Sequence, residues 1–328
     1  MIINRRRFLA DSGFNALSRM TVRNGLNKKS VSHNTDMNDE CTLFPEKANF
    51  DLMSEVMKFR KIDAHVHVYW PDFTKILGWV RGSPETQIFF GKKLRIEKQV
   101  ISRYLNVMPG SPEQFRKYNN LTIEAMKKYP DNFLGGFVIN GAYQKESLEE
   151  INRCMDAGMI GTGELYYHVK INDPRYYPII EKLIDLKMII HFHAECQLGV
   201  GGYRMKYKTT QAPNTSIPED FVDIAKRYPE GIFQFAHIGM GGDWEYECKM
   251  FADYPNIYVE TGGSNNSENM IDFAVKHIGE DRIFFGSDGA YFQGIGKILA
   301  SNLTDRQKQK IFFDNYNNVL KLGGRNVD

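Results

Sequence analysis

The chain has 328 residues, of which 42% are hydrophobic and 25% charged, and its 42 Lys and Arg nearly balance 40 Asp and Glu to leave a net charge of +2. This balance gives no basic surface for a nucleic acid or an anionic membrane, and no apolar run reaches the roughly 18–20 residues that span a bilayer. A soluble globular protein of one large domain or two is predicted. Its four scattered cysteines, without CxxC spacing, favour reduced thiols in the cytoplasm.

The first 45 residues are expected to form a basic, poorly ordered leader. Residues 5–9 read RRRFL, which resembles a twin-arginine export signal. The apolar stretch of about 7–15 residues that should follow is interrupted by Asp11, Asn15, Arg19 and Arg23. The prediction is therefore a cytoplasmic protein whose folded domain covers residues 46–328, with export through a degenerate twin-arginine-like leader as the alternative.

From residue 61 onward, short β-rich runs alternate with segments of helical periodicity. Eight runs are predicted as strands: 61–68, 98–102, 133–139, 159–166, 188–193, 232–237, 257–260 and 282–286. Three intervening helices run into Tyr-Pro just before a strand, and proline disfavours helix at the residue that precedes it. Eight strands alternating with helices over about 265 residues predict a (β/α)8 TIM barrel. The alternative is a doubly wound open sheet, but the Gly-rich phosphate loop expected after its first strand is missing.

Helix starts are predicted from capping boxes, in which a Ser or Thr and a Glu or Gln three residues later satisfy each other's backbone N–H groups. Such pairs stand at residues 147 and 150, 216 and 219, and 304 and 307. A helix is expected to begin at each pair.

Residue types that bind metals are concentrated at the ends of five of the predicted strands. Strand one ends in HVH, and because alternate residues of a strand share a face, His65 and His67 point the same way. The other four ends are GTGEL with Glu164, HFHAE with His191 and His193, AHIGMGG with His237, and FFGSDGA with Asp288. The carboxyl ends of barrel strands meet on one rim and build the active site. Unpaired polar groups there cost about 1–3 kcal/mol each, so packing alone does not explain the convergence.

His191 and His193 share one face of strand five, so either can serve as the ligand from that strand. His193 is preferred because it lies nearer the carboxyl end of the strand. His191 is expected one layer deeper, as a core histidine or as a partner that orients a ligand. His168 is expected to be a loop residue without a role.

Taken in order, IDAHVH, GTGEL, HFHAE, AHIGMGG and FFGSDGA, with the terminal helix IFFDNYNNVLKL, resemble the amidohydrolase superfamily. The resemblance is closest to its amidohydrolase-related (amidohydrolase 2) branch and covers roughly residues 60–325. It implies a divalent metal held by four residues: His65, His67, His193 and Asp288. It also implies that His237 lies beside the metal and assists catalysis.

Glu164 stands where many members of the superfamily have a carboxylated lysine or a glutamate that bridges two metals, so one or two ions per chain are implied. Imidazole with carboxylate oxygens suits Zn²⁺, with Mn²⁺ or Fe²⁺ as alternatives. Such an ion lowers the pKa of a bound water from 15.7 to about 7. Asp288 is expected to accept the proton of that water, and His237 to polarise the scissile carbonyl or bind a second metal.

The resulting prediction is a metal-dependent hydrolase that uses a metal-activated water on a C–O or C–N bond of a small lactone, ester or amide. Glu164 favours hydrolysis, since related decarboxylases often lack a carboxylate at that position. The alternatives are a metal-dependent non-oxidative decarboxylase of an aromatic or unsaturated carboxylic acid, and a non-catalytic metal-binding barrel.

Trp70, after strand one, and Arg204, after strand five, are the predicted substrate contacts, because long loops on this rim carry specificity. The planar fork of Arg204 suits a substrate carboxylate. The expected partner is a small-molecule substrate, without nucleic acid or membrane, and homo-oligomerisation stays open.

Overall fold

A computed structural model describes residues 51–68, 82–102, 110–166, 169–194, 214–238, 243–263, 267, 269–325 and 327. These residues fall within one compact unit, Asp51–Asp328. The predicted leader, 1–45, lies outside the described residues. So do the predicted substrate contacts Trp70 and Arg204, and His168.

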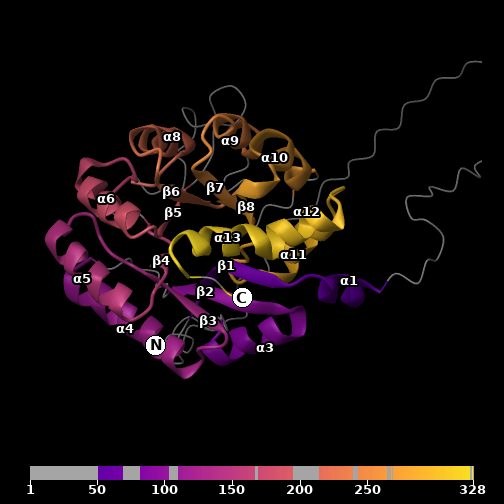
Figure 1. Ribbon diagram of the computed structural model, residues 1–328, viewed down its shortest axis with the longest axis horizontal. Coiled ribbons are helices and arrows are strands. Elements are labelled where there is room, and N and C mark those ends of the chain that lie inside the picture. Colours follow the sequence, from indigo (N-terminus) through magenta and orange to yellow (C-terminus); the bar gives the residue numbers. More distant parts are fainter. Residues whose placement is uncertain are drawn as a thin grey trace, which may run out of the picture. The chain divides into compact units, whose positions relative to one another are not determined.

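Within the described residues, eight parallel strands form one sheet in chain order, each hydrogen-bonded to the next (Figure 1). The strands are β1 Lys61–His67, β2 Ile96–Ser102, β3 Phe133–Phe137, β4 Gly161–Thr162, β5 Ile189–His193, β6 Ile232–Ala236, β7 Ile257–Glu260 and β8 Ile283–Phe284. The ring closes between the last strand and the first, where the Ala64 N–H donates to the Phe285 carbonyl at 2.8 Å. The predicted (β/α)8 barrel is confirmed.

Most helices follow a strand and lie around the outside of the ring, whereas α1 precedes the first strand and α13 lies across one end of the barrel (Figure 1). They are α1 Leu52–Lys58, α3 Pro84–Leu94, α4 Pro112–Lys128, α5 Gln144–Asp156, α6 Tyr177–Asp185, α8 Pro218–Arg227, α9 Trp244–Met250, α10 Met270–Ile278, α11 Tyr291–Leu299, α12 Asp305–Gln309 and α13 Asn315–Leu322. Two 3-10 turns, η1 Pro174–Tyr176 and η2 Glu280–Arg282, and the π-helical turn η3 Lys310–Asp314 complete the set. In the described part of the chain, none of these helices is both long and apolar enough to cross a membrane.

One of the three predicted helix starts is confirmed. Thr304 and Gln307 form a capping box at the start of α12. The start predicted at Ser147 is wrong, since α5 already begins at Gln144. The Ser147 hydroxyl instead donates to a backbone carbonyl seven residues upstream, at 2.9 Å, inside the fold. The box predicted for α8 is displaced by one residue, because Asp220 accepts the capping N–H bond at 3.0 Å.

The predicted strands are in the right places, and most of their ends lie within two residues of the prediction, but two strands are reduced to two residues each. The run 159–166 shrinks to the two residues of β4, and 282–286 to the two of β8. After β4 the chain leaves the ladder at Gly163, where a Cβ would collide with the Ser102 side chain of β2. It then pairs again for a single bridge between Leu165 and Phe192.

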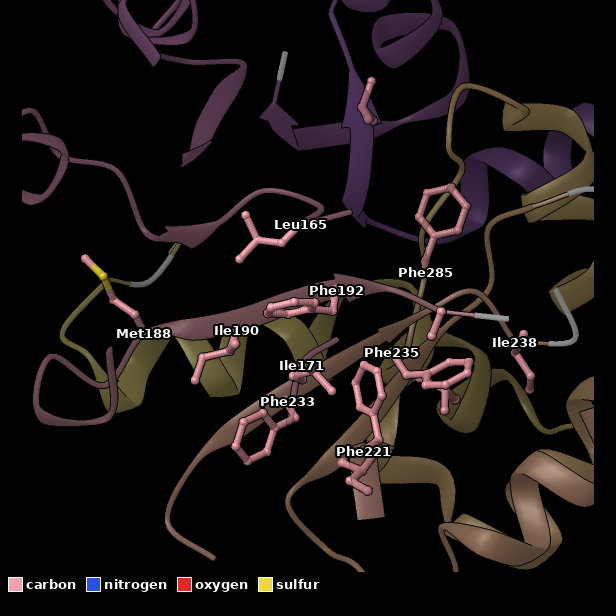
Figure 2. Packing of buried hydrophobic residues seen from close by; sticks show 14 of the residues in the cluster. Leu165, Ile171, Met188, Ile190, Phe192, Phe221, Phe233, Phe235, Ile238 and Phe285 are labelled. Atoms are coloured by element: carbon pink, nitrogen blue, oxygen red, sulfur yellow. The ribbon is translucent and has the colours of Figure 1, made fainter. Parts of the chain in front are cut away.

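The outward side chains of the strands form the main hydrophobic core with the surrounding helices. Phe192 of β5, Phe235 of β6 and Phe221 of α8 are buried in it, as Figure 2 shows. The rings of Phe221 and Phe235 lie 4.8 Å apart between their centroids. Because alternate residues of a strand point to opposite faces, this packing turns His191 and His193 to the other face of β5.

A second cluster closes the opposite end of the barrel from the candidate ligands. Ile189 and Ile232, the first residues of β5 and β6, are buried with Phe284 and with Tyr316 and Leu320 of α13. The rings of Phe284 and Tyr316 meet edge to face with centroids 5.0 Å apart. Apolar residues therefore fill the amino ends of the strands, and the polar ones are left at the carboxyl ends.

Candidate metal centre

His65 and His67, at the carboxyl end of β1, are buried and directed at the same point. Their Nε2 atoms lie 3.0 Å apart. Asp288, which follows β8, places its Oδ1 3.3 Å from His67 Nε2 and 3.9 Å from His65 Nε2. These three residues form a cluster in which one ligand atom from each lies within 4.8 Å of the others. The first and last strands of the ring therefore supply one group of candidate ligands.

The position of Asp288 is fixed by its backbone. Its φ of 47° lies in the left-handed region, which Asp tolerates better than most residues and which is often found at functional sites. The Asp288 N–H donates to the His65 carbonyl at 2.9 Å. One residue earlier, the Ser287 N–H donates to the buried carboxylate of Asp63 at 2.9 Å. Both bonds tie the turn after β8 to β1, so the Asp288 carboxylate stays beside the two histidines.

Glu164 lies between two pairs of histidines. Its Oε2 is 3.0 Å from His67 Nε2 and 3.4 Å from His65 Nε2. Its Oε1 is 2.7 Å from His193 Nδ1 and 3.5 Å from His237 Nε2. Burial alone would raise the pKa of Glu164, but His65 and His193 outweigh it and hold the pKa well below its usual range. Each oxygen of this carboxylate therefore faces a different histidine pair.

The structure separates the two histidines of β5. His193 contacts Glu164, whereas His191 packs its ring against that of His65 with centroids 4.6 Å apart. Burial and the neighbouring His65 lower the pKa of His191 well below its usual value. Its Nε2 has no hydrogen-bond partner among the described residues. His191 is therefore a neutral residue beside the centre, and His193 is the one that reaches Glu164.

The four residues predicted to hold one ion do not form a single cluster. His65, His67 and Asp288 meet, while His193 lies across Glu164, with its ring centroid 5.6 Å from that of His237. The two groups adjoin, since His237 Nε2 is 3.9 Å from Asp288 Oδ2.

The separations within the centre test whether a metal ion fits. Atoms that each lie about 2.0–2.2 Å from one ion lie roughly 3–3.5 Å from each other. The distances of 3.0 Å between the Nε2 atoms of His65 and His67 and 3.3 Å from His67 Nε2 to Asp288 Oδ1 agree with this range, and the 3.9 Å from His65 Nε2 to Asp288 Oδ1 is slightly longer. Imidazole nitrogens with carboxylate oxygens are also the donor set of divalent transition metals. The residues present therefore fit such an ion.

Glu260, the last residue of β7, belongs to the site but was not among the predicted residues. Its Oε1 lies 3.1 Å from His65 Nδ1 and 2.5 Å from His237 Nδ1. Burial would raise its pKa, but His237 and His65 hold it well below the usual range. The rule that carboxyl ends of barrel strands face the site applies to β7 as well, and it could have identified Glu260.

Two further residues lie at the site but belong to no motif from which they could have been predicted. The Ser102 hydroxyl, at the end of β2, lies 3.4 Å from His67 Nδ1. The half-buried Tyr166 sets its ring edge to face with His193, with centroids 4.1 Å apart. Ser and Tyr are common at strand ends, so only their contacts connect them with the centre.

The carboxylates determine the charge of the histidines. Burial disfavours the imidazolium of His237, but Glu260 and Glu164 outweigh it and raise the pKa to about 10. Burial likewise opposes the charged form of His65, and the same two carboxylates raise its pKa well above the usual value. Without a metal, protons therefore occupy nitrogens that a cation would use.

With this fold and these groups, the chain belongs to the amidohydrolase superfamily, since the family profile described as Amidohydrolase matches residues 62–315. The resemblance inferred from the five strand-end motifs is confirmed. No curated protein matches the chain in sequence.

Three solved structures illustrate the likeness of fold. 2,6-Dihydroxybenzoate decarboxylase from Rhizobium has 16% identity and a TM-score of 0.65, covering 80% of this chain and 99% of its own. A dihydroxybenzoic acid decarboxylase from Polaromonas sp. JS666, with bound manganese and the inhibitor 2-nitroresorcinol, has 16% identity, a TM-score of 0.62 and coverage of 80% and 97%. 5-Carboxyvanillate decarboxylase from Sphingomonas paucimobilis has 12% identity, a TM-score of 0.63 and coverage of 80% and 99%.

Proposed function

We propose that this chain is a metal-dependent, non-oxidative decarboxylase of an aromatic or unsaturated carboxylic acid. The observation that carries the proposal is the likeness to decarboxylases of 2,6-dihydroxybenzoate and 5-carboxyvanillate over 99% of their chains. The cluster of histidines and carboxylates at the carboxyl rim supports it. The sequence favoured a hydrolase, and the similar structures favour the alternative.

The reaction breaks the bond between the substrate carbon and its carboxyl group, releases CO₂ and requires a proton for that carbon. A divalent ion would supply a Lewis acid for the substrate carboxylate. His65, His67 and Asp288 would hold it. His237 can hold the required proton, because its pKa is raised to about 10. Its Nε2 lies 3.9 Å from Asp288 Oδ2, so a proton can be shared between the two groups through one water.

The ion is proposed to be a divalent transition metal rather than zinc in particular. The decarboxylase from Polaromonas holds manganese. Imidazole and carboxylate donors accept Mn²⁺, Fe²⁺ or Zn²⁺. The sequence-based preference for zinc thus has no support from the similar structures.

A hydrolase with two ions is the second candidate, and the geometry of Glu164 favours it. One oxygen faces His65 and His67, and the other faces His193 and His237. This is the arrangement that a carboxylate needs in order to bridge two cations. Hydrolysis would then require Asp288 to accept the proton of the attacking water.

Metal content and product identity together distinguish the two candidates. The protein is loaded with Mn²⁺, freed of excess ion, and analysed for metal per chain beside the variant Glu164→Gln. A decarboxylase should hold about one ion per chain in both proteins and release CO₂ in step with acid consumed. A binuclear hydrolase should hold about two ions, and the variant about one, because the bridging charge is lost.

A matched control guards against a general effect of removing a buried carboxylate. Glu150 is fully buried on α5 and pairs with Arg153 at 2.5 Å, outside the site. Glu150→Gln should retain the metal content of the wild type. Hydrolysis of lactones or amides, without CO₂ from any hydroxylated benzoate, would refute the decarboxylase.

A further inference from the structure

Glu260 contacts two histidines of the centre from the side that faces away from the candidate ion. Its Oε1 lies 3.1 Å from His65 Nδ1 and 2.5 Å from His237 Nδ1. The opposite ring nitrogen of each histidine, Nε2, is the one that faces Glu164 and Asp288. The two rings stack with 5° between their planes and centroids 4.9 Å apart. The same carboxylate oxygen of Glu260 thus contacts the Nδ1 atoms of both imidazoles.

This contact determines which ring nitrogen carries a proton. An ionised carboxylate only accepts, so an imidazole hydrogen-bonded to it presents N–H on that side. The proton that stays on His65 and His237 is then the one on Nδ1, and each Nε2 offers a lone pair to the centre once the proton there has been displaced. The His65 contact is a hydrogen bond, whereas the closer His237 contact is not aligned as one.

Two glycines leave the space that the Glu260 carboxylate occupies. A Cβ on Gly286 would lie 2.9 Å from Glu260 Cδ and 3.2 Å from His65 Cβ. A Cβ on Gly262 would lie 2.7 Å from Glu260 Oε2 and 2.8 Å from His237 Nδ1. Real Cβ atoms do not approach carboxylates so closely, so any larger residue at either position would displace the group.

The loop after β7, residues 261–263, is fixed by Lys297 and donates a hydrogen bond to the Glu260 carboxylate. The Gly262 N–H donates to Glu260 Oε2 at 2.5 Å. Lys297 of α11 donates from Nζ to the carbonyls of Thr261 at 3.0 Å and Gly263 at 3.1 Å, on both sides of that glycine. With Oε2 occupied by the loop, Oε1 is the oxygen directed at the histidines.

We propose that Glu260 is a positioning residue whose carboxylate fixes the Nδ1–H form and the ring orientation of His65 and His237, so that both Nε2 atoms face the metal centre. This rests on the metal centre of the proposed function, but not on which reaction the centre performs. Partners that orient ligating histidines in this way typically account for 10–100-fold in metal affinity or activity.

The first test is proton NMR of the wild-type protein labelled with ¹⁵N-histidine, with and without Zn²⁺. An Nδ1–H bonded to a carboxylate resonates far downfield and exchanges slowly with water. A signal of this kind is expected for His65, assigned by its loss in His65→Asn. Absence of a downfield Nδ1 proton on His65 overturns the proposal, and this measurement needs no variant of Glu260.

The second test is zinc affinity, measured by competition with a chromophoric chelator. Glu260→Gln keeps the size of the side chain but removes its charge, and is expected to weaken binding 10–100-fold. The matched control Glu150→Gln removes another fully buried carboxylate and should stay within about twofold of the wild type. Equal affinity in Glu260→Gln and wild type overturns the proposal.

Failure of the proposed function gives a different result. If the wild type binds no Zn²⁺ or Mn²⁺, the metal centre itself is refuted. The downfield Nδ1 proton of His65 in the metal-free protein then decides the role of Glu260 without any metal. If Glu260→Gln does not fold, the wild-type spectrum likewise decides.

Discussion

Replacing Asp63 by Asn should stabilise the metal-free protein at neutral pH. Asp63 is fully buried in β1, and its Oδ1 accepts the N–H groups of Ser287 at 2.9 Å and His65 at 3.2 Å. Its Oδ2 has no hydrogen-bond partner among the described residues. Burial therefore raises its pKa from 3.8 to about 7, although the bonds to Ser287 and His65 act in the opposite direction.

The sign and the size of the effect follow from this raised pKa. Between about pH 4 and about pH 7, folded Asp63 holds a proton that the unfolded chain has released. Its contribution to stability is complete below the unfolded pKa and is lost as the pH rises through the folded one. At 1.36 kcal/mol per pKa unit, a shift of about three units corresponds to roughly 4 kcal/mol. Asn keeps the acceptor oxygen and cannot ionise, so Asp63→Asn escapes this loss.

The assay is urea unfolding of both proteins, with chelator present, at intervals between about pH 4 and about pH 8. Other titrating groups are common to both proteins and cancel in the difference between their unfolding free energies. As the pH rises from about 4 to about 8, the unfolding free energy of Asp63→Asn should increase relative to that of the wild type by up to roughly 4 kcal/mol. A difference between the two unfolding free energies that does not change with pH would refute the reasoning.

Four further predictions concern the centre and the leader. Asp288→Asn should lose metal and slow turnover by about 10²–10⁴-fold. Its circular dichroism should not change, because Asn also tolerates the φ of 47° at this position. Full activity would contradict the proposed role of Asp288 as ligand and proton acceptor. His237→Asn should keep the first metal yet slow turnover to a similar degree, and normal turnover would make it a structural residue. Metal affinity should rise with pH, because His65 holds a proton that the ion must displace. A metal affinity that does not change with pH would contradict this. Deleting residues 1–45 should leave metal content and the melting temperature unchanged, because that stretch lacks sustained apolar periodicity. A large loss of either would show that the segment packs on the barrel.

The ring of strands was predictable because each strand is a short β-rich run, and several are preceded by a helix stop such as Tyr-Pro. The end of β4 was not, since Leu165 and Tyr166 have β propensity of their own. At Gly163 the Ser102 side chain on another strand leaves no space for a Cβ, and local sequence does not reveal this contact. Tertiary contacts overrode propensity there.

The candidate site was predictable where residues form a motif and not where a role depends on contacts alone. His65 and His67 stand two apart on one strand, so their shared face follows from the period of β structure. The strand-end rule could have placed Glu260 at the site, but its role depends on its contacts with His65 and His237 on other strands. The division of the ligands into two groups across Glu164 depends on the stagger of the strands, which spacing in sequence does not specify.

The seam between β8 and β1 has a consequence for synthesis and unfolding of the chain. Because His65 and His67 leave the ribosome long before Asp288, a nascent chain would hold only part of the proposed ion's coordination until β8 docks. An ion bound by these residues would then act as a clasp between distant parts of the chain, and its binding free energy would oppose opening of the ring. At a free concentration about 100 times its Kd, such a clasp adds about 2.7 kcal/mol to the free energy of unfolding. Cellular supply of the metal would therefore influence the lifetime of the folded barrel as well as its chemistry.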